Sequence, residues 1–331
     1  MADGMTRQYL SDIETGKVLP SKEWKTSLLE TLERFNPDAP LEMLFDYVRI
    51  RFPTTDVKHV AENILRLKLS YFLHEDYGFY SYTEHYCLGD IFVLVSPEEE
   101  KGVLLELKGR GCRQFESYLL AQQRSWYEFF MDCLAGGGVM KRLDLAINDK
   151  TGILNIPRLT EKCRNEECVS VFRCFKSYRS GELVRRDEKE CMGNTLYIGS
   201  LQSEVYFCIY EKDFEQYKKN DIPIEEAEVK NRFEIRLKNE RAYYALRDLL
   251  AYDNPERTAF KIINRYIRFV DKDNTKPRSE WRISEEWAWF IGENRESMKL
   301  TTKPESYSFQ RTLNWLSHQV VTNLESGYEA G

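Results

Sequence analysis

Three predicted strands each carry one carboxylate on the face that their hydrophobic residues leave free. Alternate side chains of a strand point to opposite faces, and Glu106, Asp144 and Glu234 lie opposite the apolar residues of segments 103–109, 141–149 and 231–239. Acidic residues have low strand preference, so three such placements need a cause. Carboxylates that converge on one face would bind a hard divalent ion such as Mg²⁺ or Mn²⁺ through oxygen.

Solvent exposure is the alternative explanation for these acids. On a wet sheet face they would pair with Arg142, Arg236 and Lys108, in surface ion pairs worth less than ~1 kcal/mol each. For one strand this alternative is favoured, whereas three strands together favour a convergent site.

Other motifs for metal or phosphate binding are weak. The four histidines form neither a His-x-His pair nor an H-E-x-x-H motif, and His85 reads as structural. Cys163, Cys168 and Cys174 lack the short paired spacing of zinc sites. The glycines at 136–138 follow a predicted helix instead of opening one, which is the wrong order for a phosphate-binding loop.

A predicted hairpin, "NTLYIGSLQSEVYFCIYEKD" (194–213), places a tyrosine on the same kind of polar face. Tyr197 lies opposite Leu196 and Ile198, and Tyr206 and Tyr210 follow in the return strand. A phenol with an ordinary pKa near ~10 is a poor nucleophile unless a nearby cation stabilises the phenolate. The alternation of side chains alone is weak evidence for a catalytic role of Tyr197.

The elements that would position these residues form an α+β pattern. The segment 44–54 alternates as a strand with Tyr47, Arg49 and Arg51 on its polar face, and several strands follow over 76–108. One long aromatic helix is predicted over 112–134, and the last ninety residues read as mainly helical, with Trp281, Trp287, Trp289 and Trp315 as core or interface aromatics. We expect a mixed, mainly antiparallel sheet backed by helices over residues 39–331.

Residues 5–21 resemble the third helix and exit loop of a phage-repressor-type helix-turn-helix. Only four residues precede Met5, whereas the two preceding helices of such a domain need roughly twenty or more. Residues 1–38 are therefore expected to be a partial helix-turn-helix that is either a shortened DNA-binding form or a helix that only packs.

The overall composition indicates a globular protein but does not indicate what the protein binds. A chain of 331 residues with 42% hydrophobic content supports one large domain or a main domain with a small companion. Neither a membrane span nor a signal pattern is visible, so we expect a soluble, cytoplasmic protein, with its eight cysteines as reduced thiols. A net charge of −6 argues against nonspecific coating of nucleic acid, yet 48 Lys and Arg leave room for a local basic surface.

Four blocks in order, "ELKGRGCRQFE" (106–116), "KRLDLAIND" (141–149), "NTLYIGSLQSEVYFCIYEKDFEQ" (194–216) and "RFEIRLKNERA" (232–242), are similar to those of the replication initiation factor family. That family comprises initiators of rolling-circle plasmids and relaxases of integrative and conjugative elements. The resemblance covers residues 40–325, and the helix-turn-helix segment looks like the relaxase branch.

The resemblance implies an origin-specific nickase that cleaves one DNA strand and forms a 5'-phosphotyrosine. It implies Tyr197 as nucleophile, Asp144 and Glu234 as metal ligands and Lys212 as a basic site residue, while the third ligand stays open between Glu106 and Asp149. Arg236 or Lys108 could also steady the developing charge.

The implied cofactor is Mg²⁺ or Mn²⁺. The implied partners are origin DNA, unpaired at the nick, with a helicase and other transfer or replication proteins, and a homodimer is left open. Leu201 and Cys208 stand where plasmid members often carry Arg, which weakens the plasmid-initiator reading. The alternatives are a rolling-circle plasmid replication initiator with the same chemistry, or a non-catalytic DNA-binding regulator.

Overall fold

The computed structural model describes residues 17–18, 21, 40–181, 193–220 and 222–292. The predicted helix-turn-helix segment therefore lies almost entirely outside the described residues, as do Cys191 and Trp315. The seven described cysteines are free thiols, as predicted.

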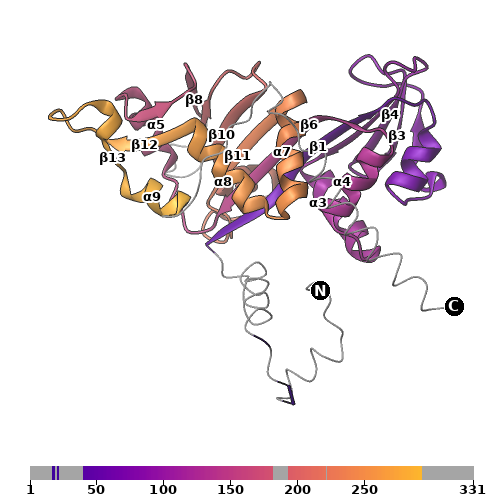
Figure 1. Ribbon diagram of the computed structural model, residues 1–331, viewed down its shortest axis with the longest axis horizontal. Coiled ribbons are helices and arrows are strands. Elements are labelled where there is room, and N and C mark those ends of the chain that lie inside the picture. Colours follow the sequence, from indigo (N-terminus) through magenta and orange to yellow (C-terminus); the bar gives the residue numbers. More distant parts are fainter. Residues whose placement is uncertain (1–16, 19–20, 22–39, 182–192, 221, 293–331) are drawn as a thin grey trace.

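One ten-stranded sheet dominates the structure (Figure 1). Every described ladder of this sheet is antiparallel. From edge to edge the order is β2 (Leu73–Glu75), β3 (Glu84–Leu88), β4 (Ile91–Val95), β5 (Val103–Lys108), β1 (Leu41–Phe52), β6 (Val139–Asp149), β11 (Asn231–Lys238), β10 (Val205–Glu211), β9 (Asn194–Ile198) and β8 (Phe175–Arg179).

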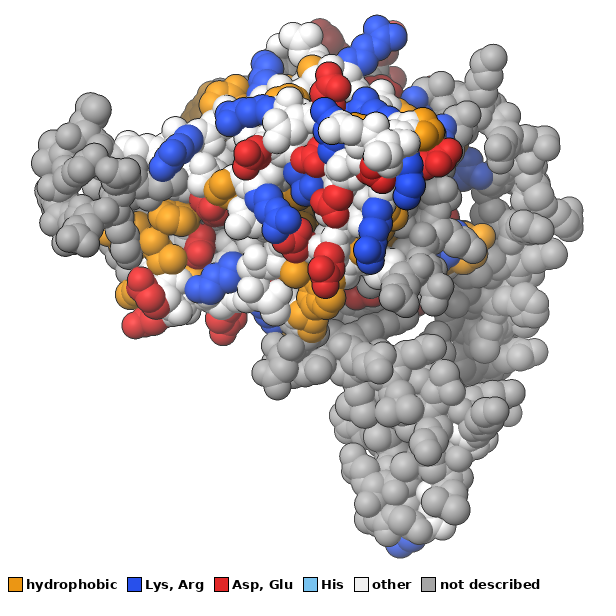
Figure 2. Space-filling model, turned by 90° about the vertical axis from the view of Figure 1, so that its left-hand side faces the viewer, with side chains coloured by type: hydrophobic (Ala, Val, Ile, Leu, Met, Phe, Trp, Pro, Cys, Tyr) orange, Lys and Arg blue, Asp and Glu red, His pale blue; other side chains and the backbone are white. Residues whose placement is uncertain are grey.

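A small second sheet packs beside the β8 end of the first. Its three strands are β13 (Arg282–Ile283), β12 (Ile267–Asp271) and β7 (Cys168–Ser170), in that order. At this end of the molecule the basic and acidic side chains of the described residues are interleaved, and these residues form no large area of one sign (Figure 2).

Helices cover one face of the large sheet, and Figure 1 shows α7 and α8 lying across its middle, with α3 and α4 beside its β5 side. Fully buried residues such as Val48, Leu145 and Phe233 point from that face into the core, as their alternation predicts. This layering confirms the α+β class. The helical segments are η1 (His59–Ile64), η2 (Leu69–Tyr71), α3 (Arg110–Ala121), α4 (Trp126–Ala135), α5 (Ile156–Arg164), α6 (Lys212–Asn220), α7 (Asn239–Tyr252), α8 (Pro255–Tyr266), η3 (Arg278–Glu280) and α9 (Glu285–Ile291).

The prediction of one long helix over 112–134 was wrong. The chain breaks between α3 and α4, where Gln123 adopts a left-handed φ of 53°. Ser125 then caps α4 in a capping box with Glu128. A capping box satisfies two backbone donors that a continuous helix would not expose, so the local signal to start a new helix outweighs the amphipathic pattern.

The prediction of core or interface aromatics in the C-terminal region is confirmed as core for two tryptophans and is not tested for Trp289. Trp287 and Trp281 are buried, whereas Trp289 is about half exposed. No helix among the described residues is both long and apolar enough to cross a lipid bilayer.

Candidate active site

The face of the sheet opposite the helices aligns most of the predicted site residues. Tyr197 on β9 pairs with Cys208 on β10, and Cys208 pairs with Glu234 on β11. One row away, Arg236 on β11 pairs with Asp144 on β6. Asp144 and Glu234 are thus diagonal neighbours on adjacent strands. The Cα atoms of such neighbours lie ~7–8 Å apart.

Two arginines hold these carboxylates, and we call Arg142, Asp144, Glu234 and Arg236 the Asp144 cluster. Arg142 donates to both oxygens of Asp144, from Nε at 2.9 Å and from Nη2 at 2.6 Å. Arg236 donates from Nε to Glu234 at 2.8 Å, and the same nitrogen lies 3.8 Å from Asp144. Arg236 therefore lies between the two acids.

The alternative explanation, in which these acids face solvent, is contradicted for Asp144 and Glu234 by their burial. Asp144 is 2% exposed and Glu234 is 3% exposed, although both do pair with the arginines that the surface interpretation named. Burial raises the pKa of Asp144 to about 6, against the opposing effect of Arg142, and the nearby charge of Glu234 adds to the rise. Asp144 thus holds a proton more tightly than an ordinary aspartate.

Tyr197 lines a cavity of about 630 Å³, together with Glu234, Arg236 and Lys212. Three effects together raise the pKa of its phenol to about 12: burial first, then the charge of Cys208 and the hydrogen bond with Cys208. The nearby charge of Arg236 acts in the opposite direction. Gly199, with a φ of 97°, ends the strand two residues later. A Cβ there would lie 3.0 Å from Phe172, so this turn requires glycine.

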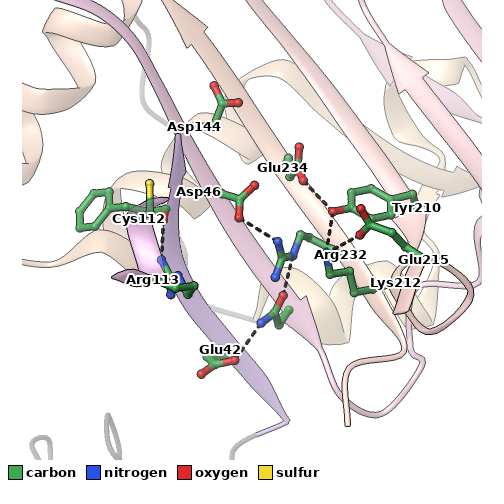
Figure 3. Close-up of polar contacts among 12 residues, drawn as sticks. Glu42, Asp46, Cys112, Arg113, Asp144, Tyr210, Lys212, Glu215, Arg232 and Glu234 are labelled. Atoms are coloured by element: carbon green, nitrogen blue, oxygen red, sulfur yellow. Dashed lines mark hydrogen bonds and ion pairs between the residues drawn. The ribbon is translucent and has the colours of Figure 1, made fainter. Parts of the chain in front are cut away.

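Lys212 reaches the same cavity from the start of α6 (Figure 3). Its Nζ lies 3.5 Å from the Tyr210 hydroxyl, and it also pairs with Glu215. The Tyr210 hydroxyl donates to Glu234 at 2.9 Å. Burial, followed by the charge of Glu234, raises the pKa of Tyr210 strongly, so this tyrosine is held as a neutral donor.

Glu106 does not join the other two acids, because β1 lies between β5 and β6. It is two strands from Asp144 and three from Glu234, or ~10 Å and ~14 Å at the usual strand spacing. Tyr47 and Arg49 on β1 bond to it, and Lys108 lies 2.6 Å away. We call Tyr47, Arg49, Glu106 and Lys108 the Glu106 cluster.

Asp149, the alternative third ligand, lies on the other face of β6. Its two oxygens accept hydrogen bonds from the turn that follows the strand and from Asn231. Of the two or three carboxylates expected to converge, Asp144 and Glu234 are therefore neighbours, whereas Glu106 and Asp149 lie apart from them. The described part of the chain contains no group of three His, Cys, Asp or Glu side chains placed to hold a metal.

Asp144 and Glu234 alone still suit a hard divalent ion. Mg²⁺ is commonly bound by one or two carboxylates, with water and phosphate oxygens completing its shell. Two diagonal carboxylates offer that donor set, and Glu234 lines the cavity.

Several cavity residues were not singled out from the sequence. Arg232 donates to Asp46 at 2.8 Å, and Figure 3 shows this pair beside Glu234. Basic side chains from two helices complete the lining of the cavity: Arg110, Arg113, Lys218 and Lys219. Their only signal in the sequence was the basic segments "GRGCR" (109–113) and "YKK" (217–219).

Two family models match the chain. Residues 138–331 match the model described as "Replication initiation factor", and residues 42–132 match the N-terminal domain of rolling circle replication initiation proteins. The chain belongs to the replication initiation factor family.

Two relatives support this assignment. The chain is 41% identical over 294 residues to the Bacillus subtilis (strain 168) protein named "Putative DNA relaxase NicK", covering 88% of this chain and 82% of that protein. The structure is similar to that of a rolling circle replication initiator protein from Geobacillus stearothermophilus, with a TM-score of 0.64 and 25% identity. That match covers 76% of this chain and 95% of the other.

Proposed function

We propose that this protein is an origin-specific DNA-nicking relaxase of a mobile element that uses Tyr197 as its nucleophile. The observation that carries the proposal is the placement of Tyr197 on the cavity wall, in one row with Cys208 and Glu234 and beside Arg236. The names of the two relatives support DNA nicking and replication initiation as the general activity.

In the proposed reaction the Tyr197 oxygen attacks a backbone phosphorus as its proton leaves. The bond from phosphorus to the 3' oxygen breaks, and that oxygen takes up a proton. The products are a 5'-phosphotyrosine and a free 3'-hydroxyl. The new phosphodiester keeps the free energy of the broken one, so the strand can be rejoined without ATP.

This reaction has two difficulties: the phenol must lose its proton, and negative charge develops on the phosphate. The residues around Tyr197 address both. A phenol whose pKa is about 12 needs a nearby positive charge as its proton leaves, and Arg236 lies 6.0 Å from the centre of the Tyr197 ring. Lys212 and Arg232 line the same cavity and would hold the scissile phosphate. Mg²⁺ or Mn²⁺ held by Asp144 and Glu234 would polarise a phosphoryl oxygen and offset the charge that develops there.

The test uses oligonucleotides that tile the DNA around the gene, incubated with protein and Mn²⁺ and separated on a denaturing gel. We expect one oligonucleotide to form a slowly migrating covalent adduct that EDTA abolishes. Tyr197→Phe should lose the adduct, while Tyr178→Phe, which alters the ring packed edge-on against Tyr197, is the matched control.

The same gel separates the competing tyrosines. If Tyr197→Phe still forms the adduct, the assignment of the nucleophile is wrong. Tyr206→Phe and Tyr210→Phe then identify which neighbouring tyrosine carries the DNA.

Rolling-circle replication initiation is the second candidate, with the same chemistry. The match of residues 42–132 to an initiator domain and the similarity to an initiator structure favour it. Nicking that is followed by strand displacement with a helicase would support initiation, whereas transfer of the strand to a recipient cell would support the relaxase. Either role calls for origin DNA, and a homodimer stays open. If no oligonucleotide is cut, the non-catalytic DNA-binding regulator is favoured.

A further inference from the structure

The loop between β2 and β3 packs onto the same face of the sheet as the Asp144 cluster. Tyr82 forms a small hydrophobic cluster with Leu94 and Leu104, separate from the main core, and Phe79 packs against it. His85 anchors the loop by bonding through Nδ1 to the Tyr77 carbonyl at 2.6 Å. The loop is therefore a fixed part of this face.

Tyr80, at the tip of this loop, is held over the Glu106 cluster. Its ring centre lies 4.3 Å from the Arg49 guanidinium carbon, and its hydroxyl accepts from Lys108 at 3.1 Å. Tyr80 and Ser81 both adopt left-handed φ values, 57° and 62°, a conformation that is unfavourable for non-glycine residues. Strain of this kind recurs at ligand-binding positions. Tyr80 nevertheless remains 48% exposed.

Glu106 gathers two cations but can neutralise only one of them. Arg49 and Lys108 both pair with this fully buried carboxylate, so the group carries one net positive charge. Burial alone would lower the pKa of Lys108, but its hydrogen bonds to Glu106 and Tyr80 outweigh this and raise it. The positive charge thus persists at neutral pH.

We propose that Tyr80, Arg49 and Lys108 form a stacking site for single-stranded DNA, with Glu106 as the residue that positions the two cations. A cation beside an exposed aromatic ring is the combination by which proteins hold single strands without reading their sequence. The inference rests on the proposed nicking function, and it gives Glu106 a role other than metal binding.

The site lies on the same face of the sheet as the proposed active site. Five strand spacings separate β5 from β9, or ~24 Å, which corresponds to ~7 stacked nucleotides at ~3.4 Å each. Between them lie Arg142, which is 3.9 Å from the centre of the Tyr47 ring, and then Arg236. A strand cut at Tyr197 could follow this face to Tyr80.

The test measures binding without cleavage. The parent is the full chain carrying Tyr197→Phe, in EDTA, and the probe is a fluorescein-labelled polythymidine of about 15 nucleotides, followed by anisotropy. Tyr80→Ala should weaken binding about 5- to 150-fold, the range for losing one stacked base. Tyr80→Phe keeps the ring and should recover most of the affinity.

Tyr252→Ala is the matched control. Tyr252 is a similarly exposed tyrosine, stacked on Arg257 at the end of α7 on the helical side of the sheet. It should bind the probe as the parent does. Lys108→Ala should also reduce the slope of log affinity against log salt by about 0.7, since one phosphate contact is lost.

Equal binding by Tyr80→Ala and its parent would overturn the inference. So would a change of oligomeric state in Tyr80→Ala without a change in probe binding, because the face would then be an interface between copies. If the tiling gel fails and probe binding still depends on Tyr80, the stacking site stands and the nicking function does not.

Discussion

The Asp144 cluster and the Glu106 cluster share one sheet face and are built from the same residue types, yet their charges are arranged differently. In the first, two buried acids face two arginines. In the second, one buried acid faces two cations. Burial raises the pKa of Asp144 to about 6, whereas the hydrogen bonds of Glu106 outweigh its burial and lower its pKa. An acid whose burial disfavours its charge would gain from a divalent cation, and a cluster with excess positive charge suits phosphate.

The largest expected difference between the clusters is in cleavage. Asp144→Asn should slow single-turnover nicking about 10²- to 10³-fold, since it removes one proposed ligand of an ion that contributes several kcal/mol to the transition state. Glu106→Gln at saturating DNA should lose less than about tenfold. Rates are measured with the oligonucleotide that forms the adduct, and DNA affinity is measured in parallel. Equal losses in both variants would remove the distinction between the clusters.

The pH dependence of stability should also differ. The folded pKa of Asp144 lies above its unfolded value of 3.8, so its contribution is present at low pH and is lost as pH rises through about 6. The lowered pKa of Glu106 gives a contribution that is present above 4.5 and is lost as pH falls. Asp144→Asn should therefore gain stability relative to the parent between pH 4 and 7, by up to about 3 kcal/mol.

Urea unfolding in EDTA at several pH values measures this difference. Asn148→Ala, on the same strand, is the control, because it removes no titrating group. A parent and an Asp144→Asn variant whose stabilities change in parallel would show that the pKa of Asp144 is not raised.

The losses of stability on truncating Glu106 and Asp144 should rank in the opposite order to the losses of cleavage rate. Glu106→Ala should lower the free energy of unfolding by about 2–3 kcal/mol at pH 7, because it leaves Tyr47, Arg49 and Lys108 without their common partner. Asp144→Ala should cost less, about 1 kcal/mol, because removing a carboxylate whose burial disfavours its charge partly offsets the loss of a partner for Arg142. Denaturant midpoints give both values, and a greater loss in Asp144→Ala would reverse the comparison.

The smallest effects on stability and cleavage should come from substituting the two tyrosines that donate to Glu234 and Glu106. Tyr210→Phe removes the bond to Glu234, and Tyr47→Phe removes the bond to Glu106. Each should cost about 1 kcal/mol of stability. Only Tyr210→Phe should also reduce nicking. A nicking defect in Tyr47→Phe alone would place the chemistry at the other cluster.

Much of the fold followed from local pattern. The alternation in segments 103–108, 141–149 and 231–238 assigned each polar side chain to its face, and the hairpin that presents Tyr197 was placed within a residue or two. The break at Ser125 was missed, because an amphipathic pattern that continues through a short gap reads as one helix.

The sequence by itself determined which residues share the polar face and which family the chain resembles, because side-chain alternation is a property of each strand alone. Only the tertiary structure decided which of those residues meet. Strand order results from pairing between distant segments, and the insertion of β1 between β5 and β6 separates Glu106 from Asp144. The same long-range packing lays the loop of Tyr80 over Arg49 and Lys108, a contact that no local pattern encodes.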